Sequence, residues 1–223
     1  MIVVSFALPA ESSGFIALLE QRQKTRDAVT GVLNGRSIAV FHTGVGVAAA
    51  APAVEAFLQH CAPQLWISSG FAGALDESLR VGDLLLASNY SAKQRPPFRS
   101  GNLASAETVV DTARDRQAMA ARTDAVAVDM ETESIANVCA ARGIPLLSFR
   151  VISDTPAAPL PLPPAVLFDV ARQRTHFPTL LLHLARHPAA VPKLIRFAGQ
   201  IATARHALTR GLELLLRDET LPT

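Results

Sequence analysis

The chain has 223 residues, of which 49% are hydrophobic and 18% charged, and this composition excludes a disordered or fibrous protein. It favours one α/β domain with a well-buried sheet. The formal charge of +2 is uneven, because residues 172–217 carry +7 and leave −5 for the rest. Such a basic segment could suit nucleic acid, but one Tyr and one Trp offer few stacking platforms and no nucleic-acid motif is present.

The N-terminal residues 1–8 are expected to form a first strand and not a signal peptide, because they lack a basic segment and a cleavage site. No stretch is long and apolar enough to span a bilayer. Cys61 and Cys139 lie among small apolar neighbours, so we interpret them as core thiols in a reducing compartment. The protein is therefore expected to be cytoplasmic.

The first strand is followed by Pro9-Ala10-Glu11-Ser12-Ser13-Gly14 and a helix over residues 15–22. Glu11 could simply be a favourable charge at that helix N-terminus. A turn is expected over residues 31–35, between two short strands. A strand over residues 37–42 then runs into Thr43-Gly44-Val45-Gly46 and a helix over residues 47–61. These glycines would let backbone N–H groups approach an anion or a sugar, although the loop could equally be a tight turn.

Two further strands are expected over residues 65–69 and 81–87, around the segment Gly70-Phe71-Ala72-Gly73. A short polar stretch over residues 88–100 leads to Ser105-Ala106-Glu107-Thr108-Val109-Val110. An exposed helix over residues 111–122 and a strand over residues 125–128 follow.

Two acidic clusters lie in the segment 127–155. Asp129-Met130-Glu131 precedes an apolar helix, and Ser153-Asp154 ends the apolar strand over residues 146–152. Both clusters are expected at one edge of the sheet, where ligands bind in open α/β folds. For Asp154 alone, a solvated turn is as good an interpretation as a site. The combination with Met130 and Glu131 favours a site, because a buried unpaired charge is costly.

The composition changes after Thr155. Five prolines predict an extended connector over residues 157–178, after a core over residues 1–156. Basic amphipathic helical segments are expected over residues 179–186, 191–203 and 207–217, within a C-terminal region 179–217 packed on or beside the core. They could form a last core helix with a cap or an oligomer contact, or a membrane-surface element that attracts anionic headgroups.

The motifs VDMETESIA (residues 128–136) and FRVISDT (residues 149–155) carry a family resemblance. Together they resemble the signature of the purine nucleoside phosphorylase and nucleosidase superfamily, most of all the methylthioadenosine/S-adenosylhomocysteine nucleosidase branch. The resemblance extends over residues 1–156. From Leu160 on, the chain is similar to the hopanoid-associated phosphorylase-like proteins. The resemblance implies a single three-layer α/β/α domain with a mixed central sheet and C-terminal helices, often assembled as a homodimer.

The resemblance also implies catalytic roles. Asp154 would be the acid at purine N7, oriented by Arg150 and Ser153. Glu11 would take a proton from the attacking water. Further residues would bind the substrate. Glu131 would bond the ribose hydroxyls, and Met130 would pack under the sugar. The other substrate-binding residues would be Asp129, Gly44 and Gly70.

Two positions depart from the family pattern. Phe71 stands where many members have a small polar residue near the sugar and nucleophile, and it replaces the serine that phosphorylases use on phosphate. Val109 occupies the position of the phenylalanine that stacks on the purine, and a valine cannot stack as a ring does. Val110 would supply the backbone contacts to the base. The phosphate-binding Gly-Asp-Pro turn and its arginine are absent near residues 9–14.

These residues predict an enzyme that cleaves the N-glycosidic bond of a purine nucleoside, an adenosine with an apolar 5′ substituent, and that needs no metal or organic cofactor. Hydrolysis is favoured over phosphorolysis, and adenosylhopane is the boldest candidate substrate. Two alternatives stay open, namely a phosphorylase that holds phosphate through other residues and a non-catalytic nucleoside-binding protein. With a lipid-linked substrate, the protein would sit peripherally on the inner face of a membrane.

Overall fold

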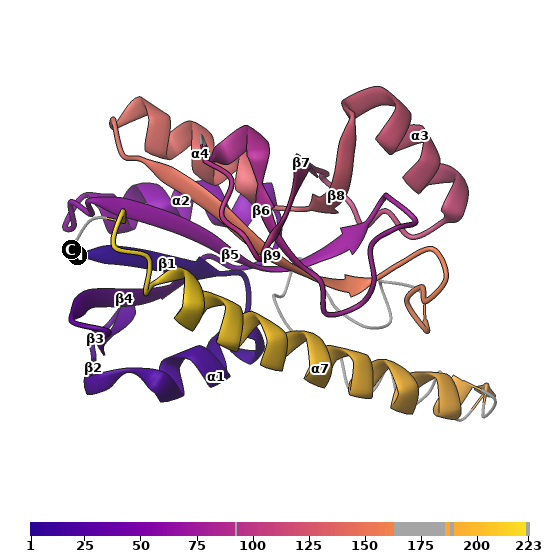
Figure 1. Cartoon of the computed structure of the whole chain (residues 1–223), viewed down its shortest axis with the longest axis horizontal. Coiled ribbons are helices and arrows are strands. Elements are labelled where there is room, and N and C mark those ends of the chain that lie inside the picture. Colours follow the sequence, from indigo (N-terminus) through magenta and orange to yellow (C-terminus); the bar gives the residue numbers. More distant parts are fainter. Residues whose placement is uncertain (92, 163–185, 188–189, 222–223) are drawn as a thin grey trace.

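Strand β1 (Ile2–Phe6) lies inside the sheet because all five of its side chains are buried. It pairs in parallel with β4 (Arg36–His42) on one side and with β5 (Leu65–Ala74) on the other. The computed structural model describes residues 1–91, 93–162, 186–187 and 190–221 (Figure 1). The predicted strands over residues 37–42 and 65–69 are confirmed, and β5 continues five residues further than expected.

The described residues form one nine-stranded mixed sheet, in the order β2-β3-β4-β1-β5-β8-β7-β6-β9. Strand β9 also pairs in parallel with β5, so β5, β8, β7, β6 and β9 close into a ring. This closure brings the end of β9 beside the end of β5. The remaining strands are β2 (Glu20–Lys24), β3 (Ala28–Leu33), β6 (Leu84–Ala87), β7 (Arg99–Ser105), β8 (Ala125–Asp129) and β9 (Leu146–Asp154).

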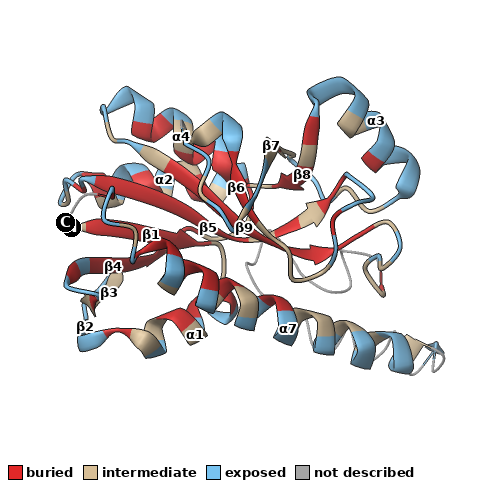
Figure 2. Ribbon diagram, viewed as in Figure 1, coloured by how far each residue is buried: buried red, intermediate tan, exposed pale blue. Residues whose placement is uncertain are grey.

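Helices cover both faces of the sheet, which confirms the predicted three-layer α/β/α domain (Figure 1). Helices α2 (Val47–Leu58) and α4 (Thr132–Ala141) pack on one face around the fully buried Trp66. Helices α1 (Pro9–Leu18) and α7 (Val191–Leu215) cover the other face (Figure 2). Helix α3 (Ala113–Thr123) packs against the end of β8, and a short 3-10 helix, η1 (Ser88–Tyr90), follows β6.

Helix α1 starts earlier than expected. The predicted helix over residues 15–22 in fact begins at Pro9, whose fixed φ suits a first helical turn, and ends at Leu18. Residues 20–24 form the edge strand β2 instead, paired antiparallel with β3. Glu11 therefore lies within the first turn of a helix and not in a loop before it.

Helix α7 is one continuous helix where two segments, 191–203 and 207–217, were expected. Its second half is core, because Ala204, Leu208 and Leu212 recur every four residues and are fully buried where α7 packs against β9 and α1. Gly211 allows this close approach, since a β carbon there would lie 2.7 Å from Leu84 Cδ1 and 2.9 Å from Phe149 Cζ. The second half of α7 thus belongs to the same hydrophobic cluster as β1 and β9.

The first half of α7 extends beyond the sheet, and Ile195 is 68% exposed there (Figure 2). The predicted segment 179–186, up to residue 185, and the connector from residue 163 lie outside the described residues. None of the helices in the described ranges has the length and apolar character needed to cross a membrane.

Arg36 links β4 to residues 216–221 by hydrogen bonds. Its buried guanidinium donates to the carbonyl oxygens of Leu216 (3.0 Å), Asp218 (2.8 Å) and Leu221 (2.8 Å).

We expect Arg36→Met to lower the free energy of unfolding by about 3 kcal/mol, because buried carbonyls lose charged donors. Urea unfolding measures the loss, and Arg26→Met, at a side chain that is 96% exposed, is the control. Equal stability of the two variants would contradict this role.

Candidate active site

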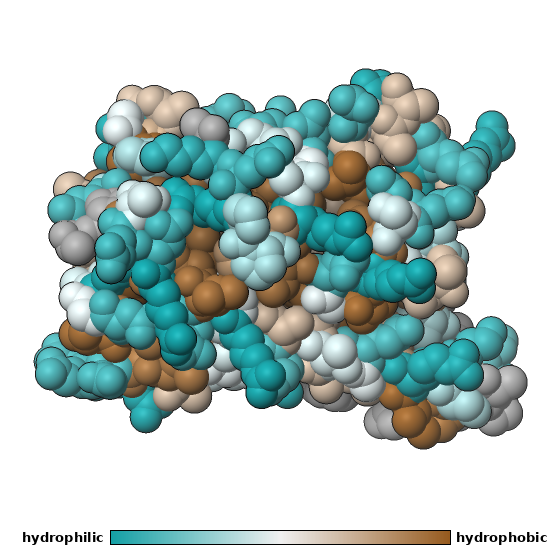
Figure 3. All heavy atoms as spheres, in the orientation of Figure 1, coloured by the Kyte–Doolittle hydropathy of each residue, from teal (hydrophilic) through white to brown (hydrophobic). Residues whose placement is uncertain are grey.

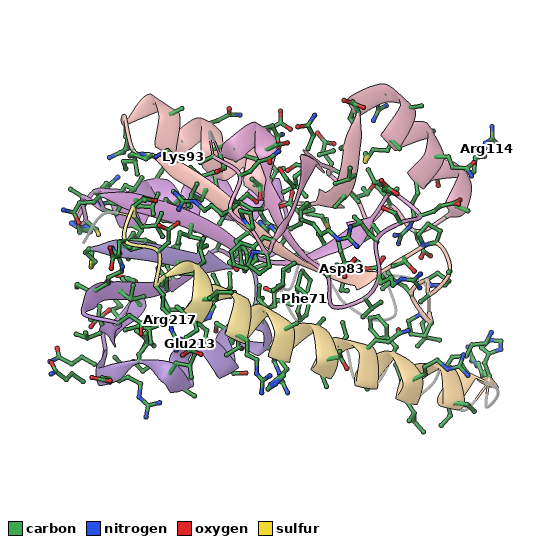
Figure 4. All side chains as sticks on the ribbon, in the orientation of Figure 1. Phe71, Asp83, Lys93, Arg114, Glu213 and Arg217 are labelled. Atoms are coloured by element: carbon green, nitrogen blue, oxygen red, sulfur yellow. The ribbon has the colours of Figure 1, made fainter. Side chains whose placement is uncertain are left out.

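A cavity of about 170 Å³ opens where the carboxyl ends of β1, β8 and β9 meet the second half of β5. Figure 4 shows Phe71, which borders the cavity, between the sheet and α7. Most of the predicted site residues are brought together here. Those that line the cavity are Glu11, Phe71, Val109, Val110, Asp129, Met130, Glu131, Ser153 and Asp154. Gly44 and Gly70 do not line it, although their neighbours Val45 and Phe71 do.

Glu11 is held by backbone amides in the first turn of α1. Its Oε2 accepts from the Leu8 N–H (2.9 Å) and its Oε1 from the Phe71 N–H (3.0 Å), so the carboxyl is fixed from two elements. Burial raises the pKa of Glu11, and these two amides with the charge of Arg150 offset part of that rise. A buried, oriented carboxylate with a raised pKa is suited to accept a proton.

Gly70 makes room for this carboxyl. A β carbon at this position would lie 2.9 Å from Glu11 Oε1 and 2.7 Å from Arg150 Nη1, and its φ of +146° is one that side chains rarely allow. Gly70 therefore acts behind the cavity wall, where it lets Glu11 and Arg150 approach the backbone of β5.

Arg150 contacts Asp129, and not Asp154 as the family resemblance suggests. Its Nη2 lies 2.6 Å from Asp129 Oδ2 and donates to Ser68 Oγ (2.7 Å) and Thr132 Oγ1 (2.6 Å). Asp129 also accepts from the Thr132 N–H (3.0 Å) and from Ser105 Oγ (2.5 Å). This pair links the end of β8 to the middle of β9 and the start of α4.

Glu131 stands at the start of α4 and faces the glycine loop 43–46. Its Oε1 accepts the Gly46 N–H at 2.7 Å, so the amide that could have approached an anion binds a protein carboxylate instead. Burial, with the charge of Asp129, raises the pKa of Glu131 to about 7. Near neutral pH the group can therefore both donate to and accept from a hydroxyl.

The raised pKa of Glu131 predicts a pH-dependent stability. A carboxyl whose folded pKa rises from 4.5 to about 7 binds more protons in the folded state, so the contribution of Glu131 to stability is fully present below pH 4.5 and is lost as the pH rises through 7. The fall amounts to about 3 kcal/mol. Glu131→Gln keeps an oxygen for the Gly46 amide and cannot titrate, so its stability relative to wild type should rise over this window. Urea unfolding at about pH 4.5 and about pH 8 tests this, and parallel pH curves would contradict it.

Asp154 ends β9 with both carboxyl oxygens engaged. Oδ1 accepts from Ser153 Oγ (2.7 Å), as the resemblance predicts. Oδ2 forms a buried ion pair with Arg116 of α3, whose Nη1 donates to the Ala74 carbonyl oxygen (2.8 Å). Sequence reasoning missed Arg116, because an arginine in a polar helix carries no sign of burial. Only the fold reveals that its side chain is 1% exposed.

The wall beside Asp154 is formed by Thr108, Val109 and Val110. Val109 is 38% exposed, and Val110 packs against the small cluster under α3. Val109 and Val110 give this wall an aliphatic surface.

Carboxyl groups dominate the polar lining of the cavity. Among the described residues that line it, four are carboxylates, Glu11, Asp129, Glu131 and Asp154, and none is Lys, Arg or His. The cations nearest to these carboxylates, Arg116 and Arg150, are already engaged with Asp154 and Asp129. The arrangement suits proton transfer and the stabilisation of positive charge on a ligand.

The fold is shared with solved nucleosidases. A 5′-methylthioadenosine/S-adenosylhomocysteine nucleosidase from Streptococcus pneumoniae, solved with a transition-state inhibitor, is 17% identical over 97% of this chain and 98% of its own, with a TM-score of 0.71. The corresponding enzyme from Colwellia psychrerythraea, in complex with adenine, is 20% identical over 70% and 84%, with a TM-score of 0.61. A futalosine hydrolase mutant from Helicobacter pylori is 21% identical over 69% and 85%, with a TM-score of 0.58.

The family model of the phosphorylase superfamily matches residues 2–96 and 87–185, which is most of the chain. This match covers both acidic clusters and all the strands of the sheet. The chain is therefore an enzyme of the phosphorylase superfamily, the family that its two motifs resemble.

Proposed function

We propose that this protein hydrolyses the N-glycosidic bond of a purine nucleoside and releases the free base. The observation that carries the proposal is a set of buried carboxylates on one small cavity, supplied by α1, the β8–α4 junction and β9. The nucleosidase folds that this chain resembles, one of them solved with adenine, support the choice of a purine.

The chemistry needs an acid, a base and negative charge near the sugar. Asp154, on the same cavity as segment 108–110, would act in its protonated form and transfer that proton to purine N7 as the C1′–N9 bond breaks and its electron pair moves to the base. Glu131 would bond the ribose hydroxyls and stabilise the positive charge that develops on the sugar. Glu11 would take a proton from water as the water oxygen bonds to C1′. Each Glu11 oxygen accepts one amide and retains a lone pair for that water.

Water suits this cavity better than phosphate as nucleophile. A phosphate dianion would enter a cavity that is lined, among the described residues, by carboxylates and no cation. Like charges at such short range are strongly unfavourable in a buried site. The side chain of Phe71 offers no hydroxyl to a phosphate, which also favours water as the nucleophile.

We further infer that the substrate has an apolar 5′ group, with adenosylhopane as the candidate. Phe71 packs against the hydrophobic core shared with α7 and gives that side of the cavity an apolar wall. The exposed Ile195 and Val191 lie beside Lys193 and Arg196 on the first half of α7, where Figure 3 shows apolar and hydrophilic atoms side by side. Such a surface would attract anionic lipid headgroups and bring the protein to a lipid-linked substrate.

The test is release of free adenine from adenosine, methylthioadenosine and a long-chain 5′-alkyl adenosine, each with and without phosphate. We expect release without phosphate, and a kcat/KM that rises with the length of the 5′ chain. Release that requires phosphate would identify a phosphorylase and reject hydrolysis. Binding of nucleosides without release of base would favour a non-catalytic binding protein.

A further inference from the structure

Helix α3 is mostly exposed to solvent. Of its eleven residues only Arg116 is buried, and its side chain is 1% exposed. Figure 4 shows Arg114, two positions earlier, at the outer side of the same helix. The burial of one arginine in a helix whose other charged side chains stay in water needs a specific reason.

The structure provides a dedicated place for Arg116. Its guanidinium lies between the Ala74 carbonyl oxygen and the Asp154 carboxylate. Gly73 leaves the space free, since a β carbon there would lie 3.1 Å from Asp154 Oδ2 and 3.2 Å from Arg116 Nη1. A buried ion pair of this kind adds little net stability, because both charges lose their hydration. Its placement beside the cavity is therefore better explained by the reaction than by folding.

Arg116 also joins two walls of the cavity. The segment 108–110 runs directly into α3, whose first turn is capped by Thr112 through the Asp115 N–H (3.1 Å). Otherwise α3 is held to the sheet by a small cluster in which Met119 and Ala120 pack beside Val128. The Arg116–Asp154 pair is thus a direct polar link between the base-facing segment and the end of β9.

We propose that Arg116 is a positioning residue for the cleavage reaction, which holds the Asp154 carboxyl and the segment 108–110 in register with the purine. This inference rests on the proposed function. When the O–H bond of Asp154 breaks and the N7–H bond forms, the negative charge left on Asp154 is balanced by the guanidinium. The nearest other charged side chains on the cavity are Glu11 of α1 and Asp129 and Glu131 after β8, and all are acidic. Arg116 is accordingly the cation in contact with this carboxyl.

The experiment compares Arg116→Met with Arg116→Lys, and uses Arg114→Met as a control on the same helix. We expect Arg116→Met to lower kcat about 10- to 100-fold with a smaller change in KM. Without the guanidinium, the negative charge left on Asp154 after proton transfer has no cation in contact, so the loss should appear in the chemical step measured by single-turnover release of base. Lysine should restore kcat in part, since one ammonium cannot reach both Ala74 and Asp154 as a guanidinium does. Arg114→Met should match wild type.

A double variant separates positioning from a purely structural role. If Arg116 acts through Asp154, then Arg116→Met should cost nothing further in an Asp154→Asn background. An additional loss in that background, or a loss confined to KM with kcat unchanged, would overturn the proposal. If Arg116→Met does not fold, as thermal melting would show, the kcat of Arg116→Lys, alone and in the Asp154→Asn background, decides by the same criterion.

Different measurements test the role of Arg116 and the proposed function. Base release by the wild type decides the function, whereas the ratio of variant to wild type decides the role of Arg116. If the wild type releases no base, calorimetric binding of adenine becomes the measure. At least fivefold weaker binding by Arg116→Met would then support the link to segment 108–110, and unchanged binding would overturn it.

Discussion

Asp154→Asn should release adenine about 1,000-fold more slowly than wild type, because an amide cannot transfer the proton that the departing base requires. The loss should appear in kcat, since the shape and hydrogen-bonding reach of the side chain are nearly unchanged. Single-turnover release of adenine measures the chemical step directly. The buried Arg116 also loses its charged partner, so the variant should melt at a lower temperature than wild type.

A matched control for this change is Asp27→Asn, at an exposed carboxylate far from the cavity, which should leave both release and melting unchanged. Activity of Asp154→Asn within tenfold of wild type would reject Asp154 as the acid. In that case hydrogen-bond donors in the cavity would have to stabilise the leaving base without proton transfer.

Glu11→Gln should lower kcat for hydrolysis about 100- to 1,000-fold, because the amide cannot accept the proton of the attacking water. Adenine affinity should change little, since Glu11 lies on α1 and the base-facing segment 108–110 comes before α3. The amide nitrogen cannot accept either N–H that Glu11 now binds, so one of Leu8 or Phe71 loses a partner. This loss should reduce stability by about 1–3 kcal/mol.

Adenine release and calorimetric binding, measured on the same preparation, separate the two effects on Glu11→Gln. Glu133→Gln serves as the control, because Glu133 lies in the first turn of α4 with its side chain exposed. Full turnover by Glu11→Gln would remove Glu11 from the reaction and reopen the choice of nucleophile.

The part of the site that was predictable from the sequence is the part that local pattern determines. Apolar runs ending in short acidic clusters place Asp129, Glu131 and Asp154 at the ends of buried strands, and the structure brings all three to one cavity. The predicted helix over residues 111–122 is also confirmed, as α3. In each case the spacing of apolar residues over about a dozen consecutive positions is enough to predict the element.

The remainder depends on partners far away in the sequence. Strand β2 has five exposed polar residues, and only its pairing with β3 makes it a strand. Strand β7 was missed for a similar reason, since its polar side chains conceal its place between β6 and β8. Arg150 pairs with Asp129 instead of Asp154, a choice that depends on the register of β9 against β5. Tertiary pairing of this kind leaves no local signature.

The placement of α7 has a consequence for synthesis on the ribosome. The face of the sheet that carries Phe6, Phe149 and Val151 is completed by Leu208, Leu212 and Leu221, which come later in the sequence than every residue that lines the cavity. When residues 1–155 have been made, every element of the cavity is present, but only α1 covers this apolar face. Nascent chains of this protein therefore expose an apolar sheet surface until α7 has been made, and they should depend on chaperones that shield such surfaces. A stop codon before α7 would leave a complete set of site residues in a polypeptide that aggregates.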